Sequence, residues 1–246
     1  MLIKNIHIVD DLQDFVGDVR IKEDKICEVG QNLQPSGDEL LDFSQKNYYL
    51  LPAFTDLHVH FRDPGLTHKE DVFTGSAAAI AGGYTAVNLM PNTKPCCSTI
   101  ELVKDVERRV AEVGMIYANQ TLSMTKNLEG KDIGALKTLK KDEILFVTDD
   151  GKGVQDDALM KEIFNICKEK NITIQCHAED SRYSATDMRQ AENSMTFRDI
   201  RLCEMTNGRI HFCHVSTKEA IQAIADAQAR GVAVSCEVTP YHLVPT

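Results

Sequence analysis

Residues 51–60 read Leu-Pro-Ala-Phe-Thr-Asp-Leu-His-Val-His, and this stretch decides both the expected fold and the expected chemistry. The run is short, apolar and alternating, which predicts a β-strand. Because side chains alternate between the two faces of a strand, His58 and His60 share one face and the intervening apolar residues share the other. Two imidazoles at the end of a strand are a natural pair of metal ligands. On this stretch alone, two unrelated histidines are an equally good interpretation.

From Leu51 onward one unit recurs, in which a short apolar run is followed by a polar loop and an amphipathic helix. Seven strands are expected: Ala53–His60, Thr85–Met90, Met115–Ala118, Ile144–Asp149, Ile172–His177, Ile210–Val215 and Val232–Val238. Strands that alternate with helices predict an α/β protein with parallel strands and right-handed crossovers. A doubly wound sheet and a (β/α)8 TIM-type barrel both fit this alternation. No glycine-rich phosphate-binding motif follows a strand, so the nucleotide-binding version has no support.

A complete barrel needs eight strands. The sequence ends at Thr246, shortly after the seventh expected strand. We therefore expect either an eighth strand that the pattern does not reveal or a barrel truncated after strand seven, as the front part of a longer protein.

Two other features describe the organisation of the chain. Residues 1–50 contain short, partly alternating apolar runs broken by polar turns, which predicts a small separate sheet. The expected domains are thus 1–50 and 51–246. Within the second, three helix starts carry a capping-box pattern, and these are Thr67-x-x-Glu70, Ser98-x-x-Glu101 and Ser216-x-x-Glu219.

Composition excludes several classes of function. The chain has 27 basic and 37 acidic residues, a formal net charge of −10, which argues against nucleic-acid and anionic-membrane partners. No apolar run approaches the length of a membrane span, and the N-terminal residues lack the apolar stretch of a signal peptide. Eight cysteines without CxxC spacing are interpreted as reduced structural thiols. We therefore expect a cytoplasmic protein.

Ligand-type side chains recur at the ends of other expected strands. Asp149 and Asp150 end the fourth, His177 ends the fifth and His214 ends the sixth. A barrel builds its active site from the carboxyl ends of its strands, so this recurrence strongly favours a metal site over chance. The remaining histidines are interpreted as structural: His211, which by parity points away from His214, together with His7, His68 and His242.

At this point the motifs resemble a known family. Residues Leu51–Gly65, with the form H-x-H-x-R-D-P-G, are similar to the amidohydrolase superfamily signature of dihydroorotases and nearby cyclic amidases. Four further motifs narrow the resemblance to dihydroorotases: Met90–Thr93, Thr148–Gly151, Cys213–Glu219 and Glu237–His242. The resemblance implies a metallo-dependent hydrolase barrel and, for the first 50 residues, a small β-sandwich.

The resemblance also implies roles for individual residues. His58 and His60 would bind one metal ion, and His177 and His214 a second. An aspartate would bridge the ions, as in a bacterial subgroup. We choose Asp150 for this role, with Asp149 as the alternative. The implied cofactor is Zn²⁺, one or two ions per chain, although manganese, cobalt and iron remain open.

Arg62 and Asn92 would hold the carboxylate of the substrate, a task that suits the planar fork of an arginine. The expected reaction is the reversible cyclisation of N-carbamoyl-L-aspartate to L-dihydroorotate in de novo pyrimidine biosynthesis, by a homo-oligomeric enzyme. The family's acid/base aspartate lies on an eighth strand that this sequence does not contain, so the catalytic residue is unknown and the 246 residues alone are expected to be nearly inactive. The alternatives are another cyclic amidase, of the allantoinase or hydantoinase type, and a non-catalytic fragment or subunit.

Overall fold

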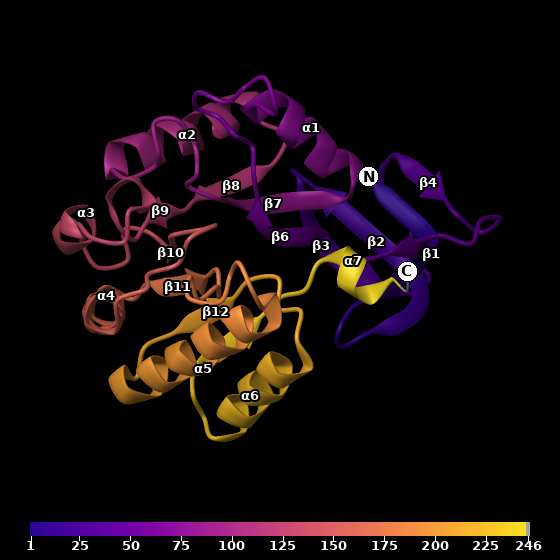
Figure 1. Cartoon of the computed structure of the whole chain (residues 1–246). Coiled ribbons are helices and arrows are strands. Elements are labelled where there is room, and N and C mark those ends of the chain that lie inside the picture. The colour runs from indigo at the N-terminus through magenta and orange to yellow at the C-terminus, as the bar shows by residue number, and fades with distance from the viewer. Residues whose placement is uncertain (245–246) are drawn as a thin grey trace. The chain divides into compact units, whose positions relative to one another are not determined.

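The computed structural model describes residues 1–244, and the protein is of the α/β class. The described chain divides into two compact units, Met1–Phe54 and the residues from Thr55 onward. Figure 1 labels the helices and strands of both units.

The first unit is built on one five-stranded sheet. Its strands are β1 (Leu2–Val9), β2 (Asp14–Lys22), β3 (Lys25–Gly30), β4 (Leu40–Asp42) and β5 (Tyr49–Leu50). The spatial order is β3-β2-β1-β4, with β5 also paired to β1. Ile6, Ile8 and Val19 form its small buried cluster. The small sheet expected from the alternating pattern is present, whereas a sandwich of two sheets stays a prediction.

The second unit contains the repeated strand–loop–helix pattern. Its strands are β6 (Phe54–Val59), β7 (Tyr84–Leu89), β8 (Tyr117–Gln120), β9 (Leu122–Ser123), β10 (Phe146–Thr148), β11 (Thr173–Cys176), β12 (Ile210–Phe212) and β13 (Val234–Cys236). They form two sheets, of order β6-β7-β8 and β13-β12-β11-β10-β9. Only Thr121 separates β8 from β9, so one broken strand joins the two sheets. Neighbouring strands from β7 to β13 pair in parallel wherever a register is defined.

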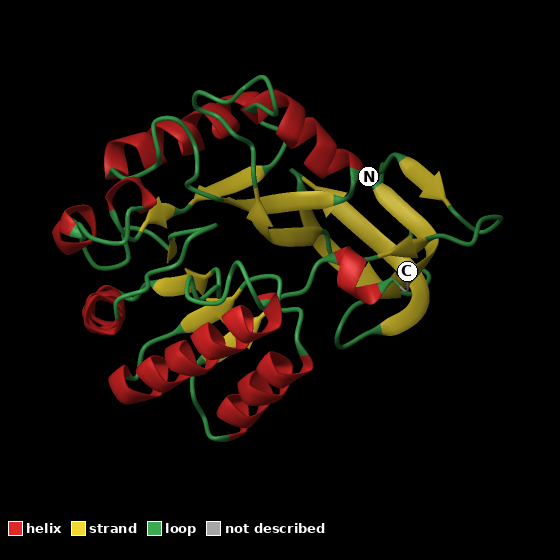
Figure 2. Ribbon diagram, viewed as in Figure 1, coloured by secondary structure: helices red, strands yellow, loops and turns green. Residues whose placement is uncertain are grey.

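The helical elements of this unit are α1 (Val72–Ala81), α2 (Ile100–Val113), the 3₁₀ turn η1 (Lys126–Leu128), α3 (Gly134–Thr138), α4 (Asp157–Lys170), α5 (Met188–Thr206), α6 (Lys218–Ala229) and α7 (Pro240–Leu243). The long helices α1, α2, α4, α5 and α6 lie on the outer side of the strands (Figures 1 and 2). All seven expected strands are present, with β8 and β9 occupying the place of the third. The order of parallel neighbours is that of successive strands in a TIM-type barrel.

Three helices begin later than the capping-box patterns predict. Asp71 caps α1 and accepts hydrogen bonds from the backbone N–H groups of Phe73 and Thr74. Thr99 caps α2 and Thr217 caps α6. The predicted cap before α2, Ser98, instead bonds across to Ser123 on β9. A hydroxyl that can satisfy a tertiary partner is therefore a poor guide to the first residue of a helix.

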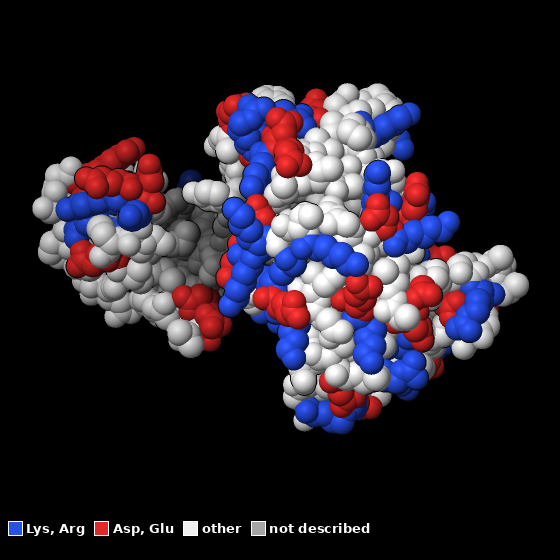
Figure 3. All heavy atoms as spheres, turned by 90° about the vertical axis from the view of Figure 1, so that its left-hand side faces the viewer, with Lys and Arg blue, Asp and Glu red and all other residues white. Residues whose placement is uncertain are grey.

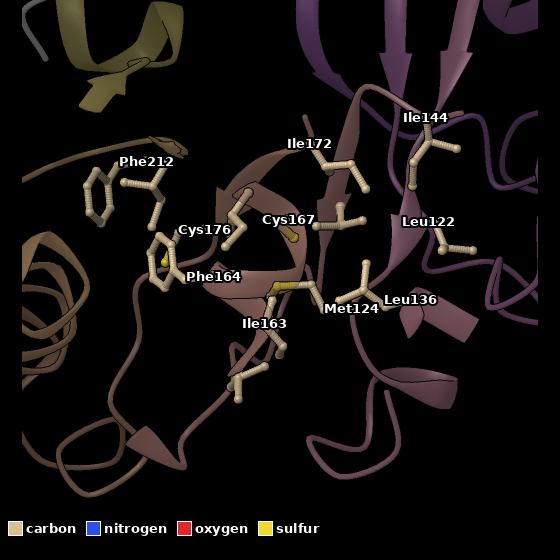
Figure 4. Packing of buried hydrophobic residues seen from close by; sticks show 14 of the residues in the cluster. Leu122, Met124, Leu136, Ile144, Ile163, Phe164, Cys167, Ile172, Cys176 and Phe212 are labelled. Atoms are coloured by element: carbon tan, nitrogen blue, oxygen red, sulfur yellow. The ribbon is translucent and has the colours of Figure 1, made fainter. Parts of the chain in front are cut away.

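Apolar residues fill the layer between the strands and the helices of the second unit (Figure 4). Phe164 of α4 and Phe212 of β12 are fully buried there. Every cysteine is a free thiol, and five of the eight are buried, in keeping with a role as small core side chains.

The strands carry polar side chains on their other face. The side-chain amide nitrogen of Asn88 on β7 lies 2.7 Å from the Gln175 side-chain oxygen and 3.0 Å from the Leu57 carbonyl oxygen. Gln175 on β11 donates to the same carbonyl at 2.9 Å. Both amide side chains are buried and hydrogen-bonded, which avoids the desolvation cost of about 1–3 kcal/mol that an unpaired buried polar group carries. They form a polar layer on the face of the strands opposite the apolar core.

The surface carries charges of both signs. Figure 3 shows lysine and arginine side chains interspersed with aspartate and glutamate over the face it presents. Some of them form ion pairs, such as Lys104 with Glu143 and Lys137 with Glu162. Among the described residues, no helix combines the length and the apolar composition that crossing a membrane requires.

Candidate metal centre and substrate site

Four histidines and one aspartate converge where the strands of the second unit end. His58 lies in β6 and His60 just after it, Asp150 follows β10, His177 follows β11, and His214 follows β12. The Asp150 carboxylate is 3.4 Å from His58 Nε2, 3.8 Å from His60 Nε2 and 3.7 Å from His177 Nδ1. His177 Nδ1 and His214 Nε2 are 3.0 Å apart. All five residues singled out in the sequence as metal ligands thus lie together.

The spacing of these atoms fits a divalent ion. His58, His60 and Asp150 form one group, and Asp150, His177 and His214 form a second, each with its ligand atoms within 4.8 Å of one another. Tetrahedral zinc with bonds of about 2.0–2.1 Å places neighbouring ligand atoms about 3.3 Å apart, close to the separations seen here. Imidazoles and a carboxylate are also ligands that zinc accepts. Asp150 belongs to both groups, as a bridging ligand would.

The two adjacent aspartates that follow β10 point toward different partners. Asp149 accepts a hydrogen bond from the backbone N–H of Thr125 at 2.9 Å and another from the Thr125 hydroxyl. Asp150 faces the histidines. Of the two candidates that the sequence leaves open, Asp150 is the one whose carboxylate lies beside the histidines.

The surroundings shift the pKa values of the histidine rings in different directions. Burial lowers the pKa of His58, but the hydrogen bonds that its ring makes with Asp150, Cys213 and Glu237 outweigh this effect and raise that pKa to about 12. Burial lowers the pKa of His60 and of His214, so both rings are neutral near pH 7. Burial also opposes ionisation of Asp150, yet the bond to His58 and the nearby histidines hold its pKa below the usual value. Asp150 is therefore a carboxylate at neutral pH.

Arg62 and Asn92 lie beside the histidines, as predicted. Arg62 Nη1 is 3.2 Å from Asn92 Oδ1, and Asn92 Nδ2 donates to Asp150 at 2.7 Å. The Arg62 backbone has a φ of 60°, a left-handed conformation that costs about 1–2 kcal/mol and is often found at functional sites. The loops of the two residues meet at Gly65, where a Cβ would overlap the Lys94 carbonyl oxygen. Glycine is required at that position for the two side chains to meet.

The expectation that His211 points away from the site is wrong. Its Nε2 is 3.2 Å from Glu237 Oε2, and Glu237 Oε1 is 3.1 Å from His58 Nδ1. The alternation that predicts opposite faces for His211 and His214 does not extend to His214, because β12 ends at Phe212 and His214 has a φ of 40°. This left-handed residue interrupts the alternation, so His211 and His214 both face inward.

Glu237 is the residue that the sequence argument missed. It was noted only as the first residue of a motif, although an acidic residue near the end of the seventh expected strand is itself a signal. Glu179 is a second carboxylate beside a histidine, 3.1 Å from His177 Nε2.

The three other histidines take structural positions. His7 bonds to Asp14 at 2.6 Å, His242 bonds to Thr239 at the start of α7, and His68 is exposed in a turn.

Comparisons with known proteins agree with this architecture. A family model described as dihydro-orotase-like matches residues 48–196. The chain is 46% identical over 244 residues to the dihydroorotase of Clostridium botulinum (strain Eklund 17B / Type B), covering 99% of this chain and 61% of the relative. It is 36% identical over 266 residues to the dihydroorotase of Sulfurihydrogenibium sp. (strain YO3AOP1), covering 100% of this chain and 62% of that relative.

Solved structures are similar as well. A D-hydantoinase superposes with a TM-score of 0.78 at 25% identity, and a dihydropyrimidinase from Brevibacillus agri with a TM-score of 0.80 at 25% identity. Each alignment covers 99% of this chain and 58% of the other. The α/β fold of this chain is thus similar to that of a D-hydantoinase and a dihydropyrimidinase. The chain belongs to the dihydro-orotase-like family, and it spans about 61% of the length of the curated relatives it matches.

Proposed function

We propose that the protein containing this chain is a dihydroorotase, which interconverts N-carbamoyl-L-aspartate and L-dihydroorotate. The single observation that carries the proposal is the position of Arg62 and Asn92 directly beside the cluster of four histidines and Asp150. An arginine that can bind a carboxylate, placed next to a metal-type centre, suits a cyclic amide substrate that bears a carboxylate. The identity to curated dihydroorotases supports the same reaction.

The cofactor we propose is zinc, at one or two ions per chain, held by His58 and His60, by His177 and His214, and by Asp150 between the pairs. The chemistry of this donor set and the separations of its atoms support the assignment. A divalent ion bound there would supply Lewis-acid chemistry, which lowers the pKa of water and polarises an amide carbonyl. We propose the complete fold to be a (β/α)8 barrel beside a small β-sandwich.

The protein's own residues would bind and orient the substrate. The Arg62 guanidinium carries several N–H donors in a planar fork, so it can take a carboxylate by two parallel bonds. Asn92 accepts a hydrogen bond from Arg62 through its side-chain oxygen and donates one to Asp150 through its side-chain nitrogen. Asn92 therefore links the arginine to the metal-type centre. The ring amide of a substrate anchored in this way would lie over the histidines. No residue of this chain is assigned as the general acid/base.

A hydantoinase is the second candidate, favoured by the fold of the solved structures. A simple hydantoin has no carboxylate, so it makes no use of an arginine fork at this place. The two candidates therefore differ in what they require of Arg62.

The test is to assay the full natural protein, supplied with zinc, for ring opening of L-dihydroorotate and of an uncharged hydantoin. We expect strong preference for dihydroorotate. Arg62→Lys should raise KM for dihydroorotate about 10-fold or more, because an ammonium ion cannot reproduce the bidentate contact. The exposed Arg108→Lys is the matched control. Equal losses on both substrates would show that Arg62 is structural, and preference for the hydantoin would establish the second candidate.

A further inference from the structure

The ring of His58 lies between two carboxylates. Its Nε2 is 3.4 Å from Asp150 Oδ1, and its Nδ1 is 3.1 Å from Glu237 Oε1. Glu237 follows β13, so the contact reaches His58 from a different strand than Asp150 does. The His58 side chain is 12% exposed and that of Glu237 is 22% exposed, so bulk water competes weakly for either partner.

The contacts around Glu237 define where the protons must be. An ionised carboxylate only accepts hydrogen bonds, so His58 Nδ1 and His211 Nε2 both donate to Glu237. In a neutral His211 ring the remaining Nδ1 is an acceptor, and the Ser235 hydroxyl lies 2.8 Å from it. Each contact from Ser235 through His211 and Glu237 to His58 then has one donor and one acceptor. With Nδ1 bonded to Glu237, Nε2 is the nitrogen of His58 that faces Asp150, and it would bind a metal ion on losing its proton.

The strands themselves hold this chain of contacts. His211 and Ser235 are directly paired residues of β12 and β13, and the His211 side chain is 8% exposed. Glu237 lies two residues beyond Ser235 and shares its face. The carboxylate therefore has little freedom to turn away from His58.

We propose that Glu237 is a positioning residue that fixes the ring orientation and the Nδ1 proton of His58, with His211 as its support. The inference rests on the proposed metal centre, to which His58 would present Nε2. Carboxylates that orient a metal-binding histidine in this way typically contribute about 10- to 100-fold to metal affinity.

A competing arrangement would make Glu237 a metal ligand itself. His58, Cys213 and Glu237 also place their ligand atoms within 4.8 Å of one another. In that arrangement Glu237 and the Cys213 sulfur would bind the ion directly. Because a cobalt–thiolate bond has an intense near-ultraviolet absorption band, the two arrangements are distinguishable by cobalt substitution.

The experiment measures Co²⁺ and Zn²⁺ dissociation constants by chelator competition for the wild-type chain, Glu237→Ala and Glu237→Gln. We expect about 10- to 100-fold weaker binding for the alanine variant and a smaller loss for glutamine, whose single side-chain oxygen cannot accept from both histidines without a change of tautomer. Glu143→Gln is the matched control, since its side chain is 19% exposed and ion-paired but lies before β10, at the opposite end of that strand from Asp150. Unchanged affinity in both Glu237 variants would overturn the proposal. So would a thiolate band that disappears in Cys213→Ser.

A second measurement separates this inference from the proposed function. In the metal-free chain labelled with ¹⁵N-histidine, His58 should show a slowly exchanging Nδ1 proton, assigned by its loss in His58→Asn. Glu237→Ala should abolish that signal, while Glu143→Gln should retain it. A wild-type chain that binds no metal would contradict the proposed function, and the fate of this proton would still decide the role of Glu237. Persistence of the signal in Glu237→Ala would overturn it.

Discussion

The two faces of the strands in the second unit carry opposite kinds of side chain. Outward residues such as Phe212 and Ile174 are fully buried against helices, whereas inward residues such as Gln175 and His211 form polar contacts. Just after β10, Asp149 and Asp150 are adjacent in sequence yet contact different partners, Thr125 and the histidines. Because alternation assigns neighbouring residues to different surroundings, stability and chemistry are distributed along the same strands. Changes on one face should therefore leave the other nearly intact.

The largest expected effect is on the inward face. Replacing His58 and His60 with alanine should remove the zinc bound by that pair, because a metal deprived of most of its ligands is held weakly. Elemental analysis after dialysis should show the loss, while the unfolding midpoint of the metal-free chain stays near that of the wild type. His68→Ala with His242→Ala is the matched double control. Undiminished metal content in the His58/His60 variant would contradict the assignment.

A change on the outward face should lower the stability of the protein and leave its metal content unchanged. Phe212→Ala leaves a cavity in the apolar layer and should cost about 3–5 kcal/mol of unfolding free energy. Urea denaturation checks this, with the half-exposed Phe197→Ala as the control. Metal stoichiometry of the folded variant should be unchanged. If Phe212→Ala lost metal at concentrations of urea where it remains folded, the two faces would not be independent.

The smallest effect concerns the loop after β11. Asp180 accepts hydrogen bonds from Arg182 and from the Ser194 hydroxyl, and the Arg182 guanidinium holds the pKa of its carboxyl well below the usual range. A lowered folded-state pKa adds stability above the unfolded pKa of about 3.9, and this stability is lost progressively as the pH falls further. Asp180→Asn should therefore destabilise the protein modestly at pH 7, with the difference from the wild type narrowing below about pH 4.

Urea titrations at pH 7 and pH 3 measure that narrowing. Asp226→Asn, at an exposed carboxyl on α6, is the control and should show the same small difference at both values. A gap between wild type and Asp180→Asn that widens on acidification would refute the role of the Arg182 contact.

Much of the architecture follows from the sequence pattern. The seven expected strands exist because short apolar runs bounded by polar loops bury one face against helices. The spacing of His58 and His60, and the alternation of Gln175 and His177, also place these side chains on the predicted face.

The errors have local causes. His211 was assigned to the wrong face because alternation holds only within a strand, and the left-handed backbone at His214 lies beyond its end. The start of α2 lies one residue later than predicted, because the Ser98 hydroxyl bonds to Ser123 on β9 rather than to its own helix. Glu237 was missed since its importance depends on pairing between β12 and β13, which no single segment of sequence reveals.

The amide layer of Asn88 and Gln175 also bears on how firmly a ligand histidine is held. Both side chains donate to the carbonyl of Leu57, so they connect β7 and β11 to β6 at the residue before His58. The backbone position of His58 therefore depends on side chains from two other strands, and loosening either amide should widen the range of positions that the ring can take.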